Sequence, residues 1–156
     1  LFRSLVQFFN MARIKLQLPE SFIFETSLYV RITDINYGGH LGNDALLSLI
    51  HDVRLQFFQS FGGSELDLFG TAVIMADVAV VYKAETFQGE TLHFKVTADD
   101  FGPFGFDVYY RVTKEKDGQA QLVAEAKTGI VCFNYQEREK ATVPQAFLDA
   151  VNARKA

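Results

Sequence analysis

The sequence has few of the residues and patterns that mark a disulfide-rich or membrane-spanning protein. Cys132 is the only cysteine, so the chain cannot form an internal disulfide, and a lone thiol in an apolar stretch indicates a reducing compartment. The opening stretch LFRSLVQFFN has short apolar runs, interrupted by Arg3 and Gln7, and lacks a cleavage site of small residues. We therefore expect a cytoplasmic protein with no membrane partner.

Concentrated positive charge and metal-ligand patterns are also lacking. The net charge is −4 and the lysines and arginines are scattered singly, which argues against a nucleic-acid partner. The three histidines lack the spacing of a zinc site, and no phosphate-binding loop of the Walker type is present. We expect no metal site.

What the sequence does contain is the apolar content of one folded domain. The 156 residues are 49% apolar and 22% charged, which is enough for one core, whereas a disordered chain would be less apolar and more highly charged. No repeat, linker or low-complexity segment divides the chain. We expect an N-terminal extension over residues 1–20 and a single domain over residues 21–156.

The first part of that domain predicts one strand and then a long helix. Apolar and polar residues alternate over residues 22–32, the period of a half-buried strand. After a glycine-rich loop, apolar residues recur at helical spacing over residues 46–61, and Asn43 or Asp44 can cap the helix. A second, largely apolar row on this helix indicates burial on most sides; it consists of Leu47, His51, Leu55 and Phe58.

The remaining patterns predict a sheet and a short terminal helix that begins near Pro144. Strands are expected at residues 72–83, 92–98, 104–112 and 122–134. Short turns at Gly102-Pro103 and Asp117-Gly118 require antiparallel neighbours. A sheet that must cover a helix apolar on most sides curls around it. The predicted class is α+β, with a five-stranded antiparallel sheet around one long helix and a short C-terminal helix.

Three segments form a recognisable order of motifs within residues 22–150. DINYGGHLGN at 34–43 matches the pattern D-x-D-x-x-G-H-V-N-N without a gap, HDVR at 51–54 stands where E-x-A-R is expected, and YKAETFQGETL at 82–92 contains a tyrosine, a loop, Gly-Glu and a leucine. Together these segments resemble the hotdog thioesterases of the 4-hydroxybenzoyl-CoA thioesterase type. The resemblance implies a hotdog fold and hydrolysis of an acyl-CoA to a free acid and CoA, with no cofactor, because coenzyme A enters as part of the substrate.

The resemblance also indicates catalytic candidates, with departures from the family pattern. Gly42 stands at the first asparagine of H-V-N-N, and the helix glutamate corresponds to His51 or Asp52, depending on the branch of the family. The second aspartate, which acts in relatives as general base or nucleophile, corresponds to Asn36, whose amide cannot accept a proton at neutral pH. Asp52 is our first candidate for the base because one branch of the family has a helix carboxylate there, and Asp34 is the second. Asn36 and His40 are expected to position water and the thioester carbonyl.

The predicted substrate-binding residues are Gly39, Leu41 and Asn43. Backbone amides around Gly39 to Leu41 lie just ahead of a helix N-terminus, where free N–H groups and the helix dipole favour developing negative charge. Thioester hydrolysis needs such donors for its oxyanion, besides an attacking water or carboxylate.

Simpler roles and other functions stay open at this point. Asp34 and Asn36 can form Asx turns, His40 can be satisfied by backbone groups, and Asp52 can lie on a solvated helix face. An enoyl-CoA hydratase is one alternative, because a hotdog hydratase loop D-x-N-P-x-H resembles this one despite its shorter spacing and its proline. A non-catalytic acyl-CoA-binding module is another, which Asn36 in place of aspartate favours.

Oligomerisation and the acyl site are the last expectations. Hotdog domains of this size resemble subunits that pair across a two-fold axis, so we expect a homodimer or homotetramer, and the second helix row is a candidate partner surface. The aromatic residues Phe57, Phe58 and Phe61 indicate either an apolar tunnel for the acyl chain or, more commonly, core.

Overall fold

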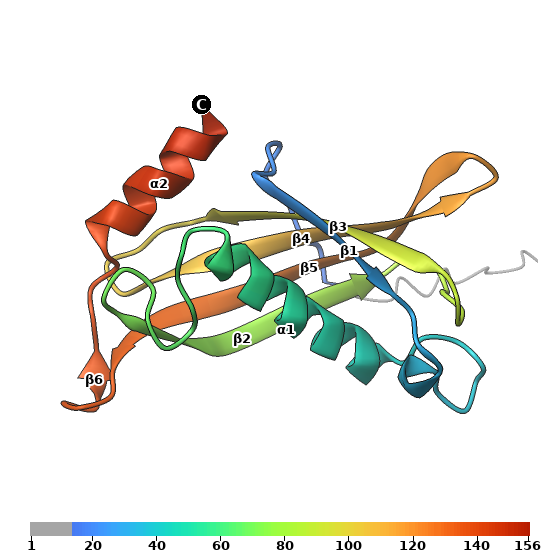
Figure 1. Cartoon of the computed structure of the whole chain (residues 1–156), viewed down its shortest axis with the longest axis horizontal. Coiled ribbons are helices and arrows are strands. Elements are labelled where there is room, and N and C mark those ends of the chain that lie inside the picture. The colour runs from blue at the N-terminus through green and yellow to red at the C-terminus, as the bar shows by residue number, and fades with distance from the viewer. Residues whose placement is uncertain (1–13) are drawn as a thin grey trace, which may run out of the picture.

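The computed structural model describes residues 14–156, in which one antiparallel sheet wraps around a long helix (Figure 1). In chain order the elements are β1 (Phe24–Tyr29), a 3-10 turn (Ile32–Asp34), α1 (Asn43–Gln59), β2 (Ala72–Tyr82), β3 (Thr91–Asp99), β4 (Gly105–Lys116), β5 (Gln119–Asn134), β6 (Glu139–Lys140) and α2 (Gln145–Lys155). The predicted α+β arrangement is confirmed. It has one strand more than expected, the two-residue β6, and residues 1–13 of the predicted extension lie outside the described residues.

The sheet order is β1-β3-β4-β5-β2, with β6 paired to β5. All neighbours are antiparallel, as the short predicted turns require. Asp117 and Gly118 join β4 to β5 with φ values of 53° and 76°, the double left-handed conformation of a tight hairpin turn. Because β2 lies at one edge and β1 at the other, α1 faces β2 on one flank and β1 on the other.

The main row of α1 forms the centre of the core. Leu46, Ile50, Val53 and Phe57 are at most 1% exposed, and in Figure 1 the helix lies across one face of the sheet. Full burial of one such side chain contributes roughly 1.5–3 kcal/mol to folding. Within the described residues, neither helix combines the length and apolar character needed to cross a membrane.

The aromatic side chains of α1 pack as core and do not line an open tunnel. Phe57 and Phe58 are fully buried, and the Phe57 ring lies 5.8 Å from that of Phe24 and 5.3 Å from that of Phe61. The second helix row is therefore divided, because Phe58 belongs to the core whereas His51 is exposed.

Candidate active site

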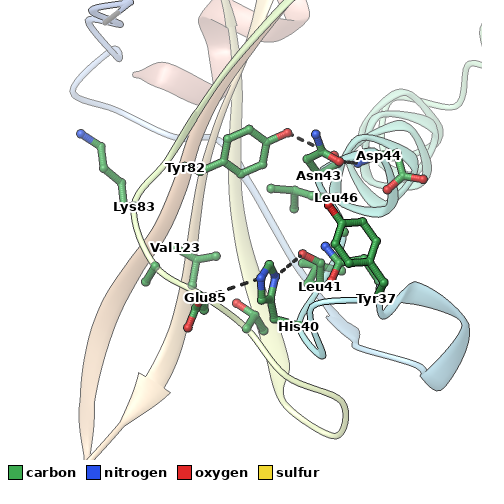
Figure 2. A pocket seen from close by; sticks show the side chains of 14 residues that line it. Tyr37, His40, Leu41, Asn43, Asp44, Leu46, Tyr82, Lys83, Glu85 and Val123 are labelled. Atoms are coloured by element: carbon green, nitrogen blue, oxygen red, sulfur yellow. Dashed lines mark hydrogen bonds and ion pairs between the residues drawn. The ribbon is translucent and has the colours of Figure 1, made fainter. Parts of the chain in front are cut away.

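A cavity of about 820 Å³ lies between the N-terminus of α1 and the end of β2. Figure 2 shows the side chains of the loop before α1 on one side and those that follow β2 on the other. The lining residues are Asn36, Tyr37, His40, Leu41, Gly42, Asn43, Asp44, Leu46, Tyr82, Lys83, Ala84, Glu85, Thr86 and Val123. Four of the predicted site residues, Asn36, His40, Leu41 and Asn43, thus come together at one cavity.

The loop that presents His40 closes on itself through Asn36. The Asn36 amide donates to the His40 carbonyl at 2.9 Å, and the Gly39 amide donates to the Asn36 carbonyl at 3.0 Å. The Asn36 side-chain oxygen accepts from the Gly38 amide at 2.8 Å, which is the Asx turn considered from the sequence. Gly39 has φ +80°, a conformation that favours glycine, and it shapes the turn without lining the cavity.

The His40 ring is oriented by a neighbouring carbonyl group. Nδ1 lies 3.2 Å from the Leu41 carbonyl oxygen, and Nε2 lies 3.8 Å from Oε1 of Glu85. A carbonyl oxygen only accepts, so this hydrogen bond forms in the neutral tautomer that is protonated on Nδ1 and has its lone pair on Nε2. Figure 2 shows the ring between Leu41 and Glu85 at the cavity. Nε2 is therefore able to accept a proton from a water held there.

The backbone amides of the loop divide into engaged and free groups. The Gly39 amide is used within the turn, and the Leu41 amide donates to the Thr86 carbonyl at 2.7 Å. Within the described part of the chain, the amides of His40 and Asn43 have no hydrogen-bond acceptor. Asn43 is the first residue of α1, where helical amides lack intrahelical partners. Free donors for an oxyanion are thus provided by His40 and Asn43 rather than by Gly39 and Leu41.

The structure places Asp34 behind the loop and outside the cavity lining. Its carboxylate is buried and accepts hydrogen bonds from Nε and Nη2 of Arg31 at 3.1 and 2.9 Å, and from the Arg31 amide at 2.9 Å. The side-chain hydrogen bond from Arg31 holds the pKa of Asp34 below its ordinary value despite burial. A paired carboxylate of low pKa is a weak base, so this geometry argues for a structural role.

Asp52 lies on the flank of α1 that faces β1, away from the cavity. It is exposed, and its Oδ1 accepts a hydrogen bond from Nε2 of Gln56 at 3.3 Å. Gln56 in turn accepts a hydrogen bond from Thr26 of β1 at 2.7 Å. Asp52 borders a separate shallow depression with Tyr29 and Arg31. The position therefore argues against Asp52 as the base for chemistry at His40.

The sequence predicted no role in the site for Tyr82, Glu85 or Asp44, which all line the cavity, although Asp44 was expected as a helix cap. The Tyr82 hydroxyl donates to the Asn43 carbonyl at 3.1 Å and so links the end of β2 to the start of α1. Burial raises the pKa of Tyr82, and the negative charge of Asp44 adds to the increase. The sequence motif at 82–92 did identify the end of β2 and the loop after it, but it did not indicate a chemical role for any residue there.

The chain belongs to the thioesterase-like superfamily, whose sequence model matches residues 30–151. No curated protein matches the chain. Among solved structures, it is similar to a thioesterase superfamily protein from Jannaschia sp. CCS1, with 18% identity, a TM-score of 0.77, and coverage of 88% of this chain and 86% of that one.

Two further similar structures have more specific names. A 1,4-dihydroxy-2-naphthoyl-CoA thioesterase from Synechocystis shares 23% identity, with a TM-score of 0.66 and coverage of 83% of this chain and 95% of that one. A 4-hydroxybenzoyl CoA thioesterase variant complexed with 4-hydroxybenzoyl CoA shares 14% identity, with a TM-score of 0.74 and coverage of 82% and 97%. At these identities the likeness shows the fold, and the predicted hotdog fold is confirmed.

Proposed function

We propose that this protein is an acyl-CoA thioesterase, which hydrolyses the thioester to a free acid and CoA. The observation that carries the proposal is the cavity at the start of α1, which is lined by His40 and Asn43. Within residues 14–156, Nε2 of His40 has no hydrogen-bond partner, and both residues have backbone amides without an acceptor. Membership of the thioesterase-like superfamily supports it. So does the fold shared with two proteins named as thioesterases of aromatic acyl-CoAs.

In the proposed reaction His40 is the general base. Its Nε2 takes a proton from water as the water oxygen bonds to the thioester carbon, and the carbonyl oxygen becomes an oxyanion held by the two free amides. Loss of one such donor typically raises the barrier by about 3 kcal/mol. The Asn36 side-chain NH2 is able to donate to the water or the carbonyl, because its oxygen is held by Gly38.

The general base proposed here, His40, differs from the two carboxylates that the sequence favoured. Asp52 was preferred for its position in the helix motif and Asp34 came second, but Asp52 lies on the other flank of α1 and Asp34 is bound by Arg31. His40, expected only to position groups, has the free lone pair at the cavity. The substitution of aspartate by Asn36 is then compatible with hydrolysis.

Coenzyme A is proposed to enter as part of the substrate, with no further cofactor. Lys83 lines the cavity with a side chain that is 43% exposed and whose Nζ lies 3.9 Å from Oε2 of Glu125, and an ammonium group with such exposure suits the phosphates of the carrier. Tyr37 is fully exposed on the loop before α1, where its ring is available to a flat group.

We further propose that the enzyme is a homodimer or homotetramer that uses the free edge of β2. Within residues 14–156, β2 has β5 as its only strand partner. Three large apolar side chains on it, Met75, Val78 and Tyr82, are 43%, 38% and 48% exposed. Unpaired apolar edges favour pairing with another strand. Because Tyr82 also lines the cavity, a second copy at this edge would border the site.

The test is enzyme-dependent release of free thiol from a panel of short-chain, long-chain and aromatic acyl-CoAs, with product masses recorded in parallel. We expect thiol and free acid to appear in equal amounts. Addition of water to an enoyl-CoA without thiol release would indicate a hydratase instead. Binding of acyl-CoA with neither product would indicate a non-catalytic module.

A further inference from the structure

The loop after β2 brings a carboxylate to the proposed base. Glu85 lies at the cavity with a side chain that is 67% exposed, and its Oε1 is 3.8 Å from Nε2 of His40, as the dashed line in Figure 2 marks. Sequence motifs indicated a base in the segment 34–52, where the family has its aspartate, and Asn36 stands at that position. The structure thus supplies a cavity carboxylate from a different element of the fold.

The position of Glu85 is defined by long-range contacts of its backbone. The Leu41 amide donates to the Thr86 carbonyl at 2.7 Å, which ties the loop after β2 to the loop that carries His40. The ammonium group of Lys114 in β4 donates to the Glu85 carbonyl at 2.7 Å. Lys114 is buried and also donates to both carboxylate oxygens of Glu90, at 3.0 and 2.8 Å. Residues 85–90 are therefore held at both ends.

Leu41 contacts both His40 and the loop that carries Glu85. Its amide fixes the loop of Glu85, and its carbonyl accepts from Nδ1 of His40. In the neutral ring Nε2 and the carboxylate oxygen are both acceptors, so they have no hydrogen to share. Once Nε2 has taken a proton, the imidazolium ring faces the Glu85 carboxylate, and solvent screening limits this attraction to the modest size of an exposed ion pair. The geometry therefore places a carboxylate beside the ring nitrogen that receives the proton during proton abstraction.

We propose that Glu85 is a positioning residue that acts through His40, stabilising the imidazolium formed when His40 takes a proton from the attacking water. The inference depends on the proposed thioesterase function and names the carboxylate of that site. The water oxygen bonds to the thioester carbon, its proton passes to Nε2, and the carbonyl electron pair moves to oxygen. When that pair returns, the carbon–sulfur bond breaks, and the leaving sulfur takes the proton from Nε2 to give the free thiol.

The test is a double-mutant cycle on kcat for thiol release, with Glu85→Gln, His40→Asn and the pair. We expect E85Q alone to lower kcat about fivefold and to leave KM within about twofold. The reason is that the Glu85 charge acts on proton transfer to His40 and not on substrate binding. In the His40→Asn background E85Q should leave the residual rate unchanged. Glu115→Gln, which removes an exposed charge outside the cavity, is the matched control and should leave kcat unchanged.

The outcomes separate this inference from the proposed function. An equal loss from E85Q in both backgrounds, an effect on KM alone, or no effect would overturn the role of Glu85 while leaving a thioesterase. Absence of thiol release from the wild type would overturn the proposed function, and the positioning role of Glu85 with it.

The contact itself has a readout that does not need turnover. A Gln amide is able to donate to Nε2, so E85Q should move the 15N resonance of Nε2 in the ligand-free protein at fixed pH, whereas Glu115→Gln should not. An Nε2 resonance that is the same in the wild type and E85Q would show that the two side chains are not in contact.

Discussion

At the scale of single residues, Arg31 and Asp34 determine the shape of the loop that carries the site. The Asp34 carboxylate binds the Arg31 guanidinium and amide, and the Asp34 backbone carbonyl accepts from the Gly42 amide at 2.9 Å. Gly42 directly precedes α1. The start of the helix, with its free amide at Asn43, is thereby tied to an ion pair in which the Asp34 carboxylate is buried and the Arg31 side chain is exposed.

Asp34→Asn should lower the free energy of unfolding by about 2 kcal/mol at pH 7, as is typical for loss of hydrogen bonds to a charged group. The pKa of Asp34 lies below its ordinary value of 3.8 in the folded protein. Its contribution to stability is therefore present above pH 3.8 and is lost as the pH falls through the lower folded pKa. Urea denaturation between pH 7 and pH 3 measures both effects.

The control for this prediction is Asp52→Asn, which alters an exposed carboxylate with a single side-chain partner. It should change stability by no more than about 0.5 kcal/mol. A loss of stability on acidification that is as large in the Asp34 variant as in the wild type would contradict the account of the ion pair.

The sequence predicted one side of the site and not the other. Asn36, His40, Leu41 and Asn43 belong to one short segment, so a local motif was sufficient to group them. Tyr82 and Glu85 reach the cavity only because the loop after β2 is held by contacts with Leu41 and Lys114, residues distant in the chain. The flank on which Asp52 lies depends on how α1 sits over the sheet, which helical periodicity does not indicate.

At the scale of elements, the β4–β5 pairing depends on a glycine at the start of β4. Gly105 lies opposite Val131, and a Cβ built on it would overlap the Ile130 carbonyl oxygen and lie 3.3 Å from the carbonyl carbon. Backbone atoms within a paired strand have little freedom to move aside. The close approach of the two strands therefore requires glycine at this position.

Gly105→Ala should destabilise the protein by about 2 kcal/mol or more, a typical cost of overpacking. Gly102→Ala is the matched control, because the nearest atom to its added Cβ is 3.8 Å away. Thermal unfolding of both variants measures the difference. Equal melting temperatures for the two variants would show that β4 and β5 accommodate the added methyl group with little loss of stability.

Most elements were predictable because their patterns are long and local. The alternating residues of β4 and the helical row of α1 point to the core as expected. The prediction that Asn43 or Asp44 caps the helix was wrong, since Gly42 in extended conformation is the N-cap and both residues lie inside α1. β6 was missed because Glu139 and Lys140 have no apolar alternation, and they form a strand only because Phe133 and Asn134 lie beside them.

At the scale of the whole molecule, the cavity lies close to the β2 edge of the sheet, which has no further strand partner within residues 14–156. Tyr82 ends β2 at that edge and lines the cavity, and Met75 and Val78 are exposed along the same strand. An edge strand with exposed apolar side chains is a template for another strand. The proposed dimer would therefore cover this edge and bring a second copy to the site.

Val78→Asp should weaken self-association at least about tenfold, because two-fold pairing at β2 would bury the new charges near one another. Tyr135→Asp is the matched control; this residue is 56% exposed but lies in the hairpin between β5 and β6. Sedimentation velocity over a range of protein concentrations measures the association. The same mass distribution for both variants and the wild type would argue against the β2 edge as the interface.

The central claim is that hydrolysis takes place at the cavity beside the N-terminus of α1, with His40 as the base. The most direct test is the kcat for thiol release from an accepted acyl-CoA by His40→Asn and Asp52→Asn, with cooperative unfolding confirmed for both. The account predicts a loss of about a hundredfold or more for His40→Asn and a change within about twofold for Asp52→Asn. Abolished turnover in Asp52→Asn with full turnover in His40→Asn would contradict it.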